Sequence, residues 1–163
     1  MSCRDIARGC NELTRSTAKR LPPPGVHEAT LSEVVGHFGT NTPRRQVLAS
    51  RLQELMSLAR ETRKRSAIWG SFVTGKLFPR DLDVFLLMQE GFGREFSALS
   101  PPQWYVFEHE SARLLFEADI FWATEAIGAA VLASWLSLFQ LTRDMRQCGI
   151  VEVILDDRDP RAI

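Results

Sequence analysis

Two short groups of residues could act together in one chemical site. Gly70 and Ser71 follow a short apolar run, and Asp81 and Asp83 begin the next one. Glycine lets the backbone turn freely and allows another group to approach it closely. A serine hydroxyl beside the N–H groups of a turn favours an anion such as phosphate. The first pair therefore predicts a phosphate-binding turn.

The second pair predicts a metal site. Asp81 and Asp83 lie two positions apart on a segment with the period of a strand, so both carboxylates should point to one face. Neighbouring carboxylates repel each other, and a divalent cation relieves that repulsion. Oxygen ligands of this kind suit Mg²⁺ or Mn²⁺. We therefore expect a metal site that faces the phosphate-binding turn.

The stretch from Gly70 to Asp83 contains Gly-Ser, a further glycine, a proline and Asp-x-Asp in that order. This order resembles the signature of the nucleotidyltransferase superfamily with the DNA polymerase beta-like fold. Within that superfamily the chain is most similar to small bacterial nucleotidyltransferase-like proteins with a Gly-Ser-Phe-Val-Thr segment. The family pattern includes a third carboxylate on a later strand, for which Asp119 is our choice and Glu117 the substitute.

The resemblance implies transfer of a nucleoside monophosphate from a nucleoside triphosphate to a hydroxyl group of a protein or RNA acceptor, tRNA included. It implies that Asp81, Asp83 and Asp119 are both the catalytic residues and the ligands of Mg²⁺ or Mn²⁺. Asp119 would also take the proton of the acceptor hydroxyl. The implied products are the modified acceptor and pyrophosphate.

The same resemblance places Gly70, Ser71, Lys76 and Arg80 at the phosphates. Lys76 could contact the triphosphate or simply be solvated. Arg80 could clamp a phosphate, or it could pair with the aspartates and block the site. The loop before Asp81 is also one residue shorter than the common form. These departures leave an alternative open, namely a nucleotidyltransferase-like binding module without catalysis, such as an antitoxin or a defence-system component.

Length and composition predict one domain. The chain has 163 residues, of which 45% are hydrophobic, and this is enough for one real core. We expect a basic leader over residues 1–20, which could form a helix, and a single nucleotidyltransferase-like domain over 21–163. The domain is too small to include a large acceptor-binding domain. A partner protein or a second copy of the chain is therefore expected to help hold the acceptor.

The formal net charge of zero conceals a segregation of charge. Residues 1–80 contain 14 basic and 6 acidic side chains, and the numbers are reversed in residues 81–163. The densest basic segment runs from Pro43 to Arg65. It is interpreted either as a helix with a solvated face or as a footprint for nucleic acid or triphosphate. Direct nucleic-acid binding through this segment is a third functional hypothesis, and strong salt dependence would be its mark.

The cysteines and the apolar segments favour the cytoplasm. Three cysteines without Cys-x-x-Cys spacing indicate neither a disulfide framework nor a zinc site, and no signal peptide is evident. The longest apolar stretch, Ala126 to Leu141, has 16 residues. This length is short for a membrane span and predicts a buried helix instead, so no membrane association is expected.

The element pattern predicts a small mixed α/β (α+β) sheet with helices packed on one side. A capping-box match at Thr30 begins a short helix that ends near His37 or Gly39. Thr42 caps a longer helix that opens with Pro43. We expect strands at 66–69, 82–88, 116–122 and 149–155, helices at 101–115 and 125–140, and a stiff connector at 21–25. The buried stripe predicted for the longer helix is Val47, Leu48, Leu52, Leu55, Met56 and Ala59.

Overall fold

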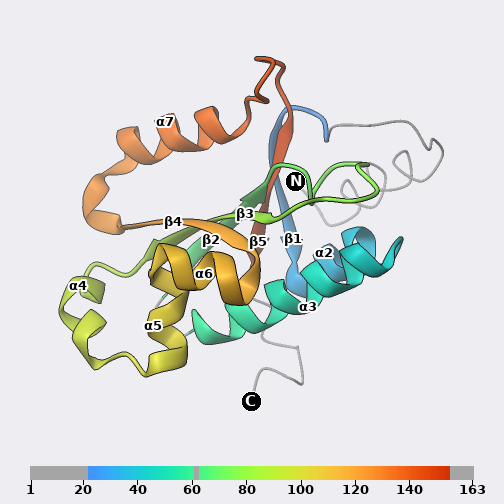
Figure 1. Ribbon diagram of the computed structural model, residues 1–163. Helices are drawn as coiled ribbons and strands as arrows, with labels where there is room; N and C mark the ends of the chain where they lie inside the picture. The colour runs from blue at the N-terminus through green and yellow to red at the C-terminus, as the bar shows by residue number, and fades with distance from the viewer. Residues whose placement is uncertain (1–21, 61–62, 155–163) are drawn as a thin grey trace.

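The computed structural model describes residues 22–60 and 63–154, which form a five-stranded mixed sheet with six α-helices and two 3₁₀ turns (Figure 1). The strands are β1 (Gly25–Thr30), β2 (Arg63–Trp69), β3 (Leu82–Met88), β4 (Ala118–Thr124) and β5 (Gly149–Ile154). The helices are α2 (Leu31–Phe38), α3 (Pro43–Leu58), α4 (Phe92–Glu95), α5 (Pro101–Phe107), α6 (His109–Phe116) and α7 (Ala129–Phe139), with the 3₁₀ turns η1 (Phe96–Ala98) and η2 (Glu125–Ile127). The predicted fold class, a small mixed sheet with packed helices, is confirmed.

The strand order in the sheet is β1-β5-β2-β3-β4. β1 runs parallel to β5, and β3 runs parallel to β4. β2 is antiparallel to both of its neighbours, β5 and β3. β1 and β4 are therefore the edge strands. β3, which contains the predicted Asp83, lies next to the edge strand β4.

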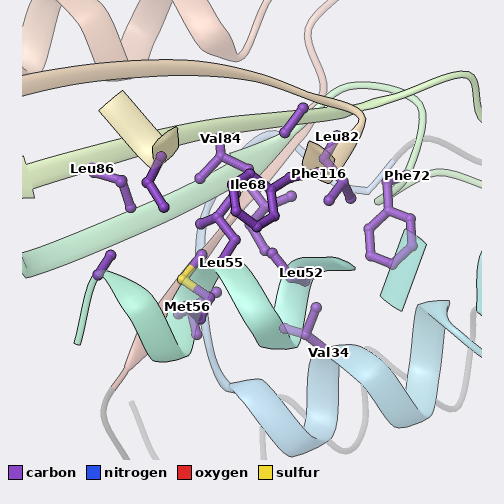
Figure 2. Close-up of a cluster of buried hydrophobic side chains, with 14 of the residues drawn as sticks. Val34, Leu52, Leu55, Met56, Ile68, Phe72, Leu82, Val84, Leu86 and Phe116 are labelled. Atoms are coloured by element: carbon purple, nitrogen blue, oxygen red, sulfur yellow. The ribbon is translucent and has the colours of Figure 1, made fainter. Parts of the chain in front are cut away.

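The larger core lies between the sheet and the helices α2, α3, α5 and α6. Figure 2 shows side chains of α3, among them Leu52, Leu55 and Met56, packed against Ile68 and Val84 of the sheet. A second, smaller cluster on the opposite face joins Phe85 and other strand residues to α7. The prediction that helices pack on one side therefore holds for α2 to α6, since Phe92 of α4 also joins the larger core, and is wrong for α7, which lies on the other face (Figure 1).

The predicted helix starts are confirmed. Thr30 and Glu33 form a capping box at α2, which ends at Phe38. The Thr42 hydroxyl accepts a hydrogen bond from the backbone N–H of Arg45, and Pro43 opens α3. The predicted stripe of α3 and Ala59 after it are buried, except for Val47, which is 44% exposed.

The strands follow the predictions, with differences in β1, β2 and β4. The strand at 82–88 is confirmed, but β2 begins at Arg63 rather than at residue 66. Arg63 is buried and donates a hydrogen bond of 2.6 Å to the Ser66 hydroxyl. A charged residue is not expected at a buried position, so the sequence did not indicate that the strand begins there. Burial lowers its pKa to about 10. Gly25, predicted to end the connector, instead begins β1, which pairs with β5, and β5 itself is confirmed within one residue.

The predicted continuous helix at 101–115 is wrong. Glu108 leaves the helical conformation, and its carboxylate accepts hydrogen bonds from the backbone N–H groups of Glu110 and Ser111 to begin α6. α6 ends when Glu117 takes a left-handed conformation with φ of 51°. Because Glu117 belongs to this turn, β4 begins at Ala118 rather than at residue 116.

The predicted buried helix at 125–140 is also corrected. Residues 125–127 form η2, and Gly128, with φ of 79°, precedes the true start of α7 at Ala129. α7 packs on the sheet along one side only, and none of its residues is fully buried. Val131 and Leu138 on its outer side are 45% and 63% exposed.

The predicted leader at residues 1–20 lies outside the described residues. Within the described part of the chain, no helix is long and apolar enough to cross a membrane.

Candidate functional site

Asp83 and Asp119 lie side by side on neighbouring strands. β3 and β4 are parallel, and their register pairs Asp83 directly with Asp119. The residues before and after each aspartate, such as Leu82 and Ile120, pack in the larger core. Because side chains alternate along a strand, both carboxylates point to the face that carries α7. Asp81 lies just before β3, with the same parity as Asp83.

The Gly70 turn lies directly against Asp83. Gly70 follows the last residue of β2 with φ of +72°, and a Cβ built on it would lie 1.9 Å from Asp83 Oδ2. No side chain fits there, so the position requires glycine both for its φ and for the close approach. The next residue, Ser71, has a buried hydroxyl without a hydrogen-bond partner among the described residues. The predicted turn and the predicted acids therefore form one continuous site.

Burial and neighbouring charges raise the pKa of Asp83 from 3.8 to about 6. Burial is the largest cause, and the negative charges of Asp81 and Asp119 add to it, while Arg143 opposes the rise. Desolvation and like charges both disfavour the ionised carboxylate. The site is therefore short of positive charge, and a cation would stabilise it.

Arg113 is a cationic neighbour of Asp119. Arg113 of α6 places Nε 3.4 Å from Asp119 Oδ1, and the Arg113 side chain is 54% exposed. This contact is an ion pair without hydrogen-bond geometry, because the buried Oδ1 atom has no hydrogen-bond partner in the described part of the chain. A buried carboxylate oxygen without a donor is available to a ligand.

Glu117, the substitute for the third acid, is used elsewhere. Its Oε2 atom accepts a hydrogen bond of 2.6 Å from Arg44 Nη1. Arg44 also donates from Nε to the Pro79 carbonyl at 3.0 Å and from Nη2 to the Arg80 carbonyl. Glu117 thus helps to anchor the end of the loop, and the structure places Asp119 rather than Glu117 beside Asp83.

The loop between β2 and β3 is held by the buried side chain of Arg45. Its guanidinium donates to the carbonyls of Phe72 at 2.7 Å, Thr74 at 2.5 Å and Lys76 at 2.6 and 3.0 Å. It also donates to the Phe38 carbonyl at the end of α2, at 2.8 Å. Arg45 is only 2% exposed. One side chain of α3 therefore fixes the course of the loop that follows Ser71.

The two predicted cations of this loop point into solvent. The side chains of Lys76 and Arg80 are exposed. No ion pair within residues 22–60 and 63–154 joins Arg80 to Asp81 or Asp83. The arrangement in which Arg80 blocks the acids is therefore not observed, and both cations are accessible to an anion.

The acids fit a hard cation in their chemistry. Within the described residues, no set of three or more His, Cys, Asp or Glu side chains is arranged so that it could hold a metal ion. Two features nevertheless favour a cation at the Asp83 and Asp119 pair. Burial, together with the like charges of Asp81 and Asp119, raises the pKa of Asp83, and Asp119 Oδ1 lacks a donor among the described residues. Asp81, which lies just before β3, is the third acid of the predicted site.

The model of the family described as "Family of unknown function (DUF6932)" matches residues 15–154. The chain belongs to this family. No curated protein and no solved structure matches the chain. The segment that matches DUF6932 contains the Gly70 turn, the acids and every described strand. The relation to nucleotidyltransferases stays a prediction from the residues.

The structure of this DUF6932 member shows that several cations of the basic segment from Pro43 to Arg65 make contacts within the chain. Arg44 and Arg45 hold the loop, and Lys64 and Arg65 pair with acids of η2 and β5 at 2.5 Å each. The side chains of Lys64 and Arg65 remain 55% and 43% exposed. Direct nucleic-acid binding through this segment stays a hypothesis, with part of the positive charge balanced by these acids.

Four site residues of the DUF6932 protein were missed by sequence reasoning, namely Arg44, Arg45, Arg113 and Arg143. Each acts on a residue at least six positions away in the chain, and most act over more than thirty. Local periodicity contains no signal for such contacts. The adjacent Arg44 and Arg45 after the Thr42 cap are a visible hint, but in the sequence they belong to the basic segment from Pro43 to Arg65.

Proposed function

We propose that this protein transfers a nucleoside monophosphate from a nucleoside triphosphate to a hydroxyl group of a protein or RNA acceptor. The observation that carries the proposal is the pair formed by Asp83 and Asp119, which lies on one sheet face against the Gly70 turn. Adjacent carboxylates beside an anion-binding turn fit a site where a cation and a triphosphate meet.

In the proposed reaction, the acceptor oxygen attacks the α-phosphorus, and the bond from that phosphorus to the bridging oxygen of the β-phosphate breaks. Pyrophosphate leaves with the bond's electron pair, and Asp119 accepts the hydroxyl proton. Mg²⁺ or Mn²⁺, when bound by Asp81, Asp83 and Asp119, supplies neutralisation of phosphate charge. The unpaired Ser71 hydroxyl is available to donate to a phosphate oxygen.

The exposed cations extend this phosphate site. Lys76 and Arg80 leave the loop toward solvent, and Arg143 approaches Asp83 from the segment between α7 and β5. We assign Lys76 and Arg80 to the β- and γ-phosphates, where a point charge and a planar fork can each bind oxygen. The proposal places the protein in the cytoplasm, with the acceptor presented by a partner protein or a second copy.

Labelled nucleotides test the reaction. Wild type, incubated with α-labelled nucleoside triphosphates, Mg²⁺ or Mn²⁺ and a cell extract, should transfer label to a macromolecule. Asp83→Asn and Asp119→Asn should each lower transfer by about 100-fold or more. Glu117→Gln is the matched control, because Glu117 contacts Arg44 instead of the acid pair, and it should retain transfer. If Asp83→Asn transferred as much label as wild type, the mechanism would be refuted.

A second function is favoured by one observation. Arg113 already pairs with Asp119, and the acids do not converge into a set of three. A protein of this kind could bind a nucleotide without transferring it, as an antitoxin or a defence-system component would. Calorimetry with Mg²⁺ and each of the four nucleotides separates the two functions. Binding without turnover on protein or tRNA acceptors would support the module, and turnover would exclude it.

A further inference from the structure

Three aromatic rings form a cluster beside the acid pair, on the face of the sheet that carries α7. Trp69 of β2 stacks on Phe139 of α7, with ring centroids 4.0 Å apart and planes within 12°. Phe121 of β4 contacts both rings, with centroid distances of 5.9 Å to Trp69 and 6.2 Å to Phe139. Phe139 also contacts Phe85, which anchors the cluster in the smaller core.

The strand register places this cluster next to the acids. Trp69 pairs with Asp83, and Asp83 pairs with Asp119, so these three residues form one row across the sheet. Phe121 follows Asp119 by two residues and shares its face, which places it about 7 Å farther along β4. A ribose can span the distance between a phosphate group near the acids and a ring near Phe121.

The ring of Phe121 packs against other aromatic rings but remains partly exposed to solvent. It is 50% exposed although it contacts two other aromatic rings. A single half-exposed phenylalanine is ordinary on a protein surface. Here, however, the ring is fixed by Trp69 and Phe139 and lies beside carboxylates. A rigid ring that stays partly open can stack a planar ligand without a large loss of side-chain freedom.

We propose that Phe121, supported by Trp69 and Phe139, is the stacking surface for the nucleobase of the nucleotide. This inference rests on the proposed function and extends it from the phosphates to the base. Stacking recognises the face of a ring, and every base has such a face. The substrate class is therefore a nucleotide bound through its ring plane as well as through its phosphates.

Calorimetry with two ligands tests the surface. In Mg²⁺, the full-length protein is titrated with ATP and with inorganic tripolyphosphate, which has the phosphates without the base. Phe121→Leu should weaken ATP binding by about 5- to 100-fold and leave tripolyphosphate binding unchanged. Phe121→Tyr keeps a ring and should bind ATP like wild type. Trp104→Leu changes a ring that is 38% exposed on α5 and serves as the matched control.

A second measurement does not depend on the stability of the leucine variant. ATP, but not tripolyphosphate, should quench part of the tryptophan emission of wild type, and this part should be missing in Trp69→Phe. Equal ATP affinity of wild type and Phe121→Leu, or an equal loss of both ligands, would overturn the stacking surface. If ATP binds through Phe121 but no label is transferred, the transfer reaction falls and the stacking surface stands. If wild type binds neither ligand, both proposals fall.

Discussion

Replacing Asp83 with asparagine should stabilise the fold at pH 8, even though the change removes a residue that the proposed reaction needs. The pKa of this carboxyl is raised from 3.8 to about 6. Each unit corresponds to about 1.4 kcal/mol, so the ionised side chain costs the folded state at most about 3 kcal/mol. Because Asp83 keeps some solvent contact, screening reduces this to roughly 1–2 kcal/mol.

The sign of the pH dependence follows from proton binding. Between pH 3.8 and about 6, the folded protein holds a proton on Asp83 that the unfolded chain has lost. The free energy of unfolding therefore falls as the pH rises through this window, and it stays lowered above it. At pH 4 the carboxyl is protonated in the folded state and half protonated in the unfolded state, so the asparagine substitution should change little.

Thermal unfolding in the presence of a chelator measures this difference. At pH 8 the Tm of Asp83→Asn should exceed that of wild type by about 2–8 °C, and the gap should nearly close at pH 4. Asp144→Asn is the control, because Asp144 is an exposed acid with a pKa lowered by hydrogen bonds from Thr142 and Arg146. It should give no stabilisation. A Tm for Asp83→Asn at or below that of wild type at pH 8 would refute the reasoning.

Three further predictions follow from the site. Arg45→Met should lower the free energy of unfolding by about 3 kcal/mol in urea titrations, because it leaves loop carbonyls without their charged donor; a loss below about 1 kcal/mol would contradict the role of this side chain. Gly70→Ala should cost at least about 2 kcal/mol, since its φ is +72° and its Cβ would collide with a carboxylate, whereas Gly36→Ala, with open space around it, should not destabilise the fold. Arg113→Gln should tighten Mn²⁺ binding several-fold in calorimetry by freeing Asp119, and unchanged affinity would show that the ion pair does not compete.

Much of the fold could be predicted because its signals are local. The caps at Thr30 and Thr42 lie next to the helices that they begin, and the apolar run after Asp81 defines β3 within its own length. β1 could not be predicted in this way. Its six residues include His27 and Glu28, and the strand exists because it pairs with β5 more than a hundred positions later.

In the candidate site, too, the features with local signals could be predicted and those that depend on distant contacts could not. The Gly70 turn and the Asp81 and Asp83 pair are visible as a pattern, and a later acid was expected through the resemblance. Asp119 is our choice over Glu117 from the sequence, but strand parity does not separate the two acids, because the distinction depends on where α6 ends. Glu117 takes the left-handed turn at that end, and Asp119 is left two residues into β4.

The grip of Arg45 on the loop has a consequence for how the protein can vary. Within the described residues, the hydrogen bonds of the Arg45 guanidinium go to main-chain carbonyls, and every amino acid has one. The side chain at Lys76 could therefore be exchanged without loss of the loop's path, as long as the arginine remains, whereas Thr74 also holds the loop through its hydroxyl, which donates to the Ser71 carbonyl at 2.9 Å. The path of the loop is thus set by a few fixed residues, and the exposed side chain at position 76 could change the ligand preference of the site independently of its architecture.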